Sequence, residues 1–374
     1  MKGNAIHFLW QDPTEIRKFR TGVSLHGHTM YSQECLSFLP RYLHMVPGVS
    51  QITRRYERPR SDARPAVDFS RAYWTPPLSP ASALELESGQ IARFGLQPLV
   101  SLTDHDDIEA PMALQLTTYR SDAPVSLEWT VPYGASYLHL GIHNLPQRQE
   151  RSWMEVLAAY TSAPNEACLP ELLRSLSEIP DALIVLNHPF WLEEGVSEKD
   201  HALALNRLLR ECLEWIHAFE LNGTRSWREN AATITLAREY GRPLISGGDR
   251  HACEASAAIN LTNAQSFSEF VAEIRDGVST LLFMPHYRDP MALRILESTW
   301  DILRPYPEYP GRERWTDRIF YRGEDGVARA LSEIWSQGAP WTLNSVAALL
   351  QVLADRRLRG AMRLLLMERG EALP

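Results

Sequence analysis

A chain of 374 residues is long enough for one large β/α barrel with an appendage or for two ordinary domains. Its apolar fraction of 44% and charged fraction of 22% are typical of soluble globular proteins, and no run is long and apolar enough to span a bilayer. The formal net charge of −8 argues against a general nucleic-acid-binding protein, because such proteins use a basic face to replace phosphate counterions.

The N-terminal segment and the cysteines predict a cytoplasmic protein. Gln11, Asp12 and Glu15 arrive too early for the uninterrupted apolar segment of a secretory signal. The four cysteines are scattered without CxxC spacing, so we expect reduced thiols rather than a disulfide framework or a zinc ribbon. They are Cys35, Cys168, Cys212 and Cys253.

Short apolar and β-branched runs alternate along the chain with helix-like stretches, which is typical of repeated β/α units around a parallel sheet. Two helices carry clear end signals. Residues 81–94 follow Ser79 and Pro80 and precede Gly95, and residues 230–240 precede Gly241. The expected strands are residues 22–25, 99–102, 125–128, 138–142, 183–186, 218–221 and 243–246.

Two regions interrupt this alternation. Residues 35–78 are rich in arginine, proline and aromatic residues, which predicts an inserted flap or a solvated surface excursion. Residues 289–374 contain amphipathic stretches at 291–303, 326–336 and 344–367 and no clear strand, so we expect a helical appendage. The predicted boundaries are therefore a barrel over residues 1–288, with its insertion at about 35–78, and a helical extension over 289–374.

Histidines and carboxylates recur where the expected strands end, which is where barrel side chains converge on a common site. An HxH pair such as His26 and His28 can present two imidazoles to one ion, because residues two apart in a strand point the same way. A lone pair of this kind is weak evidence, but its repetition along the chain indicates a metal site. The residues concerned are His26, His28, Asp104, His105, Asp106, Glu128, His139, His143, His188, Asp249 and His251.

In order, these motifs resemble those of the PHP (polymerase and histidinol phosphatase) family of metal-dependent phosphoesterases. The resemblance covers residues 22–283. Its motifs are Leu25-His26-Gly27-His28-Thr29, Leu102-Thr103-Asp104-His105-Asp106, Ser126-Leu127-Glu128, Leu138-His139-Leu140, Asn187-His188-Pro189 and Gly248-Asp249-Arg250-His251. It implies a distorted (β/α)7 barrel, here with an insertion after the first strand and the helical C-terminal appendage, and up to three metal ions at the barrel mouth.

Carried over by position, the resemblance implies how the ligands are shared. One ion would be held by His26, His28, Glu128 and Asp249, and Glu128 would bridge to a second held by His139 and His188. A third would use His105 and His251. The usual last ligand of that third site falls here on Gln33, which is uncharged, or on Glu34, which has the offset of one family variant and could ligate through a carboxylate oxygen. The number of metal ions, two or three, therefore stays open.

The surrounding residues have expected supporting roles. His143 is an extra ligand candidate for which a supporting role is favoured. Asp104 and Asp106 are expected to orient His105, since ligating imidazoles usually donate their other N–H to a partner. Arg250 is either a clamp on substrate or, as strand alternation favours, a salt-bridged support that points away from the ions.

A mixed imidazole and carboxylate shell suits Zn, Mn or Fe ions. These ions would activate water for attack on a phosphate ester, with Asp249 accepting a proton and His188 or His251 protonating the leaving oxygen. The expected substrate is a phosphorylated small molecule or a nucleotide, and no membrane is expected as a partner. The basic insertion leaves a phosphodiesterase acting on short nucleic acids open.

Two further alternatives remain. A degenerate barrel could bind metal without turnover, as the uncharged Gln33 would allow. An amidohydrolase-like enzyme also uses an early HxH motif, but it would want a metal-bridging lysine, and no lysine stands at a suitable strand end.

Overall fold

The computed structural model describes residues 4–36, 71–116, 123–193, 195–355 and 357–366, which fall into two compact units. The described part of the first unit lies within Met1–Ser32 and Leu78–Met291. The described part of the second lies within Gln33–Pro77 and Ala292–Met367. Most of the basic segment 35–78 lies outside the described residues, so its interpretation as a flap stays a prediction.

The first sheet of the first unit has the strand order β1-β12-β11-β2-β5. Its strands are β1 (Asn4–Phe8), β2 (Thr21–Ser24), β5 (Gln97–Val100), β11 (Ala258–Thr262) and β12 (Ser279–Phe283). β2 and β5 run parallel, as expected for a β/α repeat, and the first expected strands are confirmed within two residues. β11 runs antiparallel to both of its neighbours, which the repeat did not predict.

The second sheet has the order β10-β9-β8-β7-β6. Its strands are β6 (Leu127–Tyr133), β7 (Ser136–His143), β8 (Leu183–Leu186), β9 (Ala218–Asn222) and β10 (Leu244–Gly247). The expectation of parallel strands is wrong for β7, which pairs antiparallel with both β6 and β8. The reason is the tight turn at Gly134 (φ 61°) and Ala135, because a two-residue connection can join only antiparallel strands.

The two sheets are linked at two places near the ends of their strands. Gly27, just beyond β2, forms a parallel bridge with Arg250, just beyond β10, and His105 forms one with Glu128. Backbone hydrogen bonds add to each link, such as that from His28 N to Arg250 O at 2.8 Å. The unit is thus a mixed α/β fold in which neither sheet of the described residues closes on itself.

A shared apolar core lies between the sheets. Val23 of β2 packs in one buried cluster with side chains of the second sheet, including Val185 of β8, Ala218 of β9 and Ile245 of β10. Because strand side chains alternate, the residues two positions further on point the same way. For β9 that residue is Glu220, so the apolar core gives way to polar side chains toward the ends of the strands.

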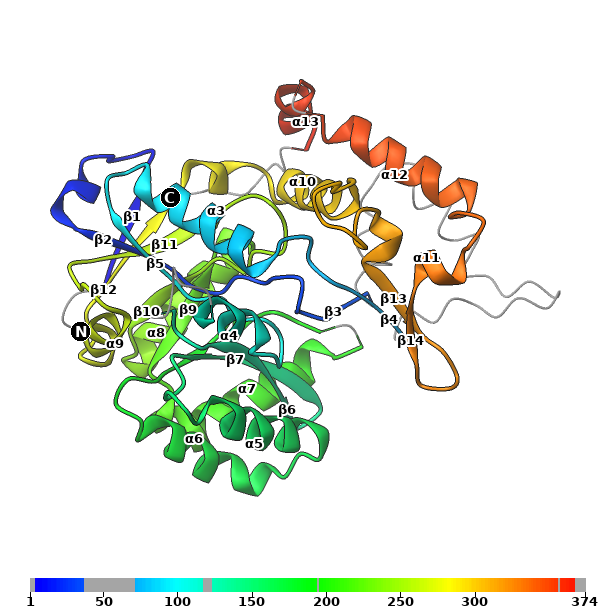
Figure 1. Cartoon of the computed structure of the whole chain (residues 1–374). Coiled ribbons are helices and arrows are strands. Elements are labelled where there is room, and N and C mark those ends of the chain that lie inside the picture. The colour runs from blue at the N-terminus through cyan, green and yellow to red at the C-terminus, as the bar shows by residue number, and fades with distance from the viewer. Residues whose placement is uncertain (1–3, 37–70, 117–122, 194, 356, 367–374) are drawn as a thin grey trace. The chain divides into compact units, whose positions relative to one another are not determined.

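Helices cover the outer faces. In Figure 1 the green helices α5, α6 and α7 pack on the second sheet, against β6, β8 and β7 respectively, while α8 packs on β9 and α3 on β5. The helices of this unit are α3 (Pro80–Ala92), α4 (Glu109–Gln115), α5 (Glu150–Ser162), α6 (Leu169–Ser177), α7 (Glu198–Cys212), α8 (Trp227–Tyr240) and α9 (Phe267–Arg275).

Two helix ends lie where the sequence predicted them. Ser79 caps α3 by accepting a hydrogen bond from Ser82 N at 3.2 Å, as predicted. Gly241 ends α8 in the left-handed conformation, also as predicted. That helix begins earlier than residue 230, because Ser226 and Glu229 form a capping box.

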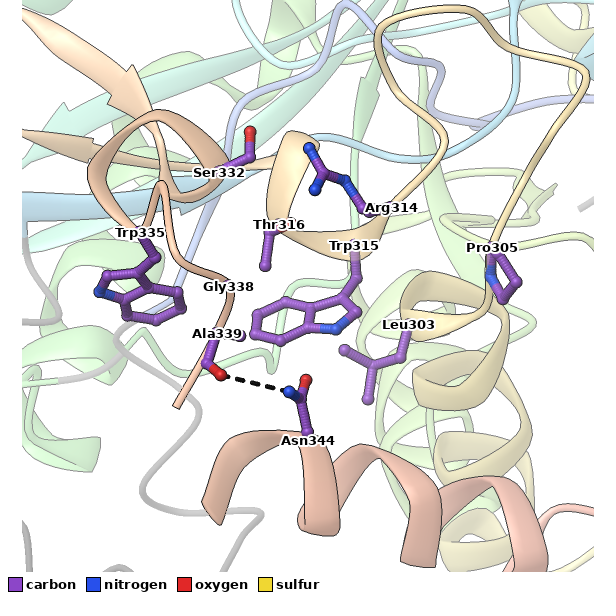
Figure 2. A pocket seen from close by; sticks show the side chains of 10 residues that line it. All are labelled: Leu303, Pro305, Arg314, Trp315, Thr316, Ser332, Trp335, Gly338, Ala339 and Asn344. Atoms are coloured by element: carbon purple, nitrogen blue, oxygen red, sulfur yellow. Dashed lines mark hydrogen bonds between the residues drawn. The ribbon is translucent and has the colours of Figure 1, made fainter. Parts of the chain in front are cut away.

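The second unit combines helices with a small sheet. Its four-stranded sheet has the order β14-β13-β4-β3, so segments from both ends of the sequence meet in it. Its elements are β3 (Glu34–Cys35), β4 (Ala72–Trp74), α10 (Met291–Leu303), β13 (Ile319–Arg322), β14 (Ala328–Ala330), α11 (Leu331–Ile334), α12 (Trp341–Leu353) and α13 (Arg359–Leu366). A pocket in this unit contains Trp315 and Trp335, and Asn344 lines it while donating to Ala339 O at 3.2 Å (Figure 2).

The expectation of a purely helical C-terminal region is wrong. Residues 326–336 form β14 and the short α11 rather than one helix, because the turn around Gly323 and Gly326 (φ 77°) folds β14 back onto β13. Residues 344–367 contain two helices, α12 and α13, rather than one. Among the described residues, no helix has the length and apolar character needed to cross a membrane.

Candidate metal centre

Six of the histidines singled out from the sequence lie together in the first unit. The ring of His28 stacks on those of His251 and His105, with centroids 4.1 and 4.8 Å apart. His105 and His188 in turn lie 5.0 and 5.1 Å from His139. His26, the sixth, is 5.1 Å from His28 and 5.6 Å from His188. Residues more than two hundred positions apart in the chain are thus brought to one place.

Glu128 lies at the middle of this histidine cluster, fully buried, and its two carboxylate oxygens face different histidines. Oε2 is 2.8 Å from His26 Nε2 and 3.4 Å from both His28 Nε2 and His105 Nε2. Oε1 is 2.9 Å from His188 Nε2 and 3.6 Å from His139 Nδ1. One carboxylate therefore serves two groups of imidazoles.

The position of Glu128 differs from the sequence expectation. It lies at the start of β6 rather than at the end of a strand, because β6 continues to Tyr133 as one arm of the hairpin. The bridge to His105 nevertheless sets Glu128 level with the residues that follow β5. Glu128 therefore lies beside the other candidate side chains, although the predicted end of its strand was wrong.

Asp249 faces the cluster from the loop after β10. Its Oδ1 lies 3.5 Å from His28 Nε2, 3.7 Å from His26 Nε2 and 3.4 Å from His251 Nδ1. Its Oδ2 accepts hydrogen bonds from Arg225 Nη2 at 2.8 Å and Thr224 Oγ1 at 3.0 Å. One oxygen is therefore held by the protein while the other is presented to the imidazoles.

These separations suit metal binding. Donors around a tetrahedral Zn²⁺ lie about 3.3 Å apart when its bonds are about 2.0 Å long. The contacts of 3.4 to 3.7 Å above are close to that spacing, whereas those of 2.8 and 2.9 Å from Glu128 to His26 and His188 are hydrogen-bond distances. In the described part of the first unit, three sets of side chains have donors within 4.8 Å of one another: His26 with Glu128 and His188, His26 with His28 and Asp249, and His105 with Glu128 and His139. The clusters are suited to divalent metal.

Backbone strain is concentrated in the same residues. His26 (φ 62°), His188 (φ 23°) and Asp249 (φ 46°) adopt left-handed conformations that side chains with a Cβ rarely take. Such strain persists only where the surrounding structure holds it, and it gathers at functional sites. Each of these residues directly follows or closely follows a strand, so the kink turns its side chain into the cluster.

Burial and mutual charge perturb the pKa values. Burial by itself raises the pKa of Glu128, but the charges of His26, His105 and His139 outweigh it and hold that pKa well below its usual range. Burial likewise lowers the pKa of His26, yet the three carboxylates of Glu128, Glu220 and Asp249 raise it well above its ordinary value. A cluster that stabilises carboxylates and cations together is the electrostatic setting that a metal ion would use.

Three residues that contact the cluster were given no role from the sequence. Glu220 of β9 lies 2.5 Å from His26 Nδ1, and Asn187 Nδ2 donates to Glu128 Oε1 at 3.0 Å. Arg225 contacts Asp249 and stacks on Trp191, 3.8 Å from the ring centroid. Only Glu220 gave a signal in the sequence, because it is a carboxylate within the otherwise apolar run Ala218 to Leu221. An unpaired charge is seldom buried in a strand, so its position there indicates a partner.

Arg250 lies in the supporting place that strand alternation favoured. Its guanidinium is buried and donates to Glu87 Oε1 at 2.9 Å, to Ala252 O at 3.0 Å and to His28 O at 3.0 Å. Because these contacts occupy it inside the protein, it supports the loops of the cluster rather than clamping a substrate. Strand alternation favoured this interpretation over the clamp.

The remaining candidates lie in supporting places. His143 is buried beside Ser101 Oγ (2.9 Å), and burial, aided by the charge of His26, lowers its pKa to about 3. Asp104 accepts from Thr29 N and Oγ1, and Asp106 from Thr130 N, so each carboxylate fixes a backbone segment, while orientation of His105 stays a prediction. Glu34 belongs to the second unit, where it is buried and pairs with Trp74 in the sheet. Its part in a third site also stays a prediction.

Comparison with protein-family models and with curated proteins finds no match. Solved structures similar to this chain include PsfC from Pseudomonas syringae, at 14% identity over 72% of this chain and 93% of that one, with a TM-score of 0.39. An amidohydrolase from Chromobacterium violaceum, with bound sulfate and no metal, is 14% identical over 61% of this chain and 87% of its own (TM-score 0.35). A Bifidobacterium adolescentis protein assigned as a metal-dependent phosphoesterase is 11% identical over 53% and 92% (TM-score 0.33). Likeness at this level carries no weight for the chemistry, which rests on the site itself.

Proposed function

We propose that this chain is a metal-dependent hydrolase, specifically a phosphoesterase that cleaves a phosphate monoester of a small molecule or nucleotide. The observation that carries the proposal is the buried Glu128, whose two oxygens face two groups of imidazoles. A carboxylate whose two oxygens are placed in this way could bridge a pair of neighbouring metal ions. The order of the motifs in the sequence, which resembles the PHP family, supports the same assignment.

The donors would divide between two ions of Zn, Mn or Fe. His26, His28 and Asp249 would hold one with Glu128 Oε2, and His139 and His188 would hold the other with Oε1. His105 and His251, with Glu34 as the proposed last ligand, would hold a third. We further infer that the two sheets form one distorted (β/α)7 barrel, which is supported by the backbone links from Gly27 to Arg250 and from His105 to Glu128.

When bound, such ions supply an acidified water and neutralise charge on the phosphoryl group. The protein's own residues supply the rest. Asp249 is fixed through Oδ2 by Arg225 and Thr224, so its Oδ1 is positioned to hold a proton of the attacking water. His188 or His251 would protonate the leaving oxygen.

Arg225 would contact the phosphate of the substrate, which is the role that the sequence suggested for Arg250. Its guanidinium carries positive charge beside Asp249, and its central carbon lies over the indole of Trp191, 3.8 Å from the ring centroid. A planar cation fixed in this way suits a phosphate, whose oxygens it can meet with two N–H groups.

The test is hydrolysis of p-nitrophenyl phosphate with added Mn²⁺. We expect activity in the wild type, none above background in His26→Ala, and unchanged activity in the control His7→Gln, which replaces a histidine of β1 outside the cluster. Equal trace rates in wild type and His26→Ala would refute the proposal. End-labelled oligonucleotides and a panel of amide substrates in the same assay separate a phosphodiesterase or an amidohydrolase from a monoesterase, and bound metal without any turnover identifies a degenerate barrel.

A further inference from the structure

We propose that Glu220 is the positioning residue of the metal centre, because its single carboxylate orients the ring of His26 and holds the backbone of His188. The inference rests on the proposed metal-dependent function of the cluster. It adds a residue that lies in the middle of β9 and is not itself one of the expected ligands.

The first carboxylate oxygen acts on His26. Glu220 Oε1 lies 2.5 Å from His26 Nδ1, and both side chains are fully enclosed. A carboxylate can only accept, so Nδ1 carries a proton and donates it to Glu220. The other nitrogen, Nε2, faces the carboxylates of Glu128 and Asp249, at 2.8 and 3.7 Å, so a metal ion bound beside these oxygens would take the place of the proton on Nε2.

The second oxygen acts on His188. Glu220 Oε2 accepts from the backbone N–H of His188 at 2.8 Å and from Asn222 Nδ2 at 3.0 Å. His188 has a positive φ of 23°, a strained conformation for a residue with a side chain. The hydrogen bond therefore fixes the kink that turns the imidazole of His188 toward Glu128 Oε1. Through its two oxygens, Glu220 joins one histidine of each proposed ion.

The neighbouring strand leaves space for this carboxylate. A Cβ on Gly247 of β10 would lie 1.5 Å from Glu220 Oε1 and 2.1 Å from its carboxyl carbon. Gly247 has no positive φ, so glycine is required at this position for space rather than for backbone conformation. A side chain at position 247 would displace the carboxylate of Glu220 from its present position, so this glycine leaves the space that the carboxylate occupies.

The variant Glu220→Gln isolates this role. An amide of nearly the same shape offers one accepting oxygen and one donating NH₂, whereas His26 Nδ1–H and His188 N–H are both donors. The glutamine therefore either leaves one donor unsatisfied or reverses the His26 tautomer and places a proton on Nε2, where a metal should bind. Either result lowers the metal affinity of the site without replacing any of the expected ligands.

The experiment measures Zn²⁺ affinity by competition with a chelator and compares Glu220→Gln with Glu150→Gln, a control at a buried carboxylate on α5. We expect affinity to fall about 10- to 100-fold in Glu220→Gln, as for other supporting partners of ligating histidines, and to be unchanged in the control. Equal affinity in wild type and Glu220→Gln, with both folded by circular dichroism, would overturn the inference.

A second measurement keeps the test decisive if Glu220→Gln fails to fold. The short bond from His26 Nδ1 to Glu220 should place that ring N–H proton far downfield in the proton NMR spectrum of the wild-type protein, and His26→Gln should remove the resonance and so assign it. Its absence from the wild type would overturn the inference. If the wild type binds neither Zn²⁺ nor Mn²⁺, the proposed function fails and the inference fails with it, whereas a wild type that binds metal but lacks this resonance overturns the inference alone.

Discussion

The buried ion pair between Arg250 and Glu87 gives the sharpest prediction about stability. Glu87 projects from α3, and its Oε1 accepts from Arg250 Nε at 2.9 Å, while Oε2 accepts from Ser24 Oγ at 2.9 Å. Both oxygens also lie 3.2 Å from Ser256 N. The side chains of the pair are only 3% and 1% exposed, so solvent cannot replace either partner. The substitution Glu87→Gln leaves a buried guanidinium without its counter-charge.

The expected cost follows from this burial. Removing one partner of a buried ion pair costs about 3 to 5 kcal/mol, because the remaining charge stays desolvated. With a denaturant slope of about 3 kcal/mol/M for a unit of this size, the urea midpoint should fall by about 1 to 1.7 M. Arg250→Met should be similarly destabilised, and the double variant should lose no more than the worse single variant, since the two changes remove the same interaction.

The assay is urea unfolding of each variant followed by tryptophan fluorescence and circular dichroism. The matched control is Glu178→Gln, which breaks the ion pair between Glu178 and Arg174 at 3.0 Å, whose side chains are 63% and 47% exposed. That change should leave the midpoint nearly unchanged, because water replaces the lost partner. A Glu87→Gln midpoint indistinguishable from that of the control would refute the reasoning.

Two other outcomes follow from the same structure. Burial, with the charges of Arg275 and Arg242, lowers the pKa of His217 to about 3, and its Nδ1 accepts from Ile184 N at 2.9 Å, so the folded protein holds it neutral. The unfolded chain binds this proton near pH 6.5, so stability should fall as pH drops from about 6.5 toward 3. His217→Asn, which keeps an acceptor for Ile184 N, should weaken that dependence in urea midpoints taken at pH 7.5 and 5, and equal slopes would contradict the assignment. Chelation should also change stability: each Zn²⁺ ion bound at 100 times its dissociation constant should add about 2.7 kcal/mol to the free energy of unfolding relative to protein treated with EDTA. Identical thermal unfolding in both states would show that the folded cluster binds no Zn²⁺.

The local features of the fold were readable from the sequence because they depend on neighbours in the chain. Ser79 and Pro80 predicted the start of α3, and Gly241 the end of α8, since capping involves residues within one turn. The apolar run at 183–186 matched β8 at both ends, because a fully buried strand is apolar throughout. The hairpin of β13 and β14 was missed because each strand is too short to give a periodic signal.

The candidate site also has some features that the sequence predicted and others that only the folded structure decided. The sequence by itself showed which side chains have the chemistry of metal donors, because imidazoles and carboxylates are recognised by residue type. They are His26, His28, Glu128, His139, His188 and Asp249. Only the tertiary structure decided which nitrogen of His26 faces the cluster, because that depends on Glu220, which lies 194 positions away along the chain. It likewise directed Arg250 inward to Glu87 and brought Arg225 to Asp249. The physical reason is that donor chemistry belongs to a residue, whereas its orientation is fixed by hydrogen bonds across strands that meet only after folding.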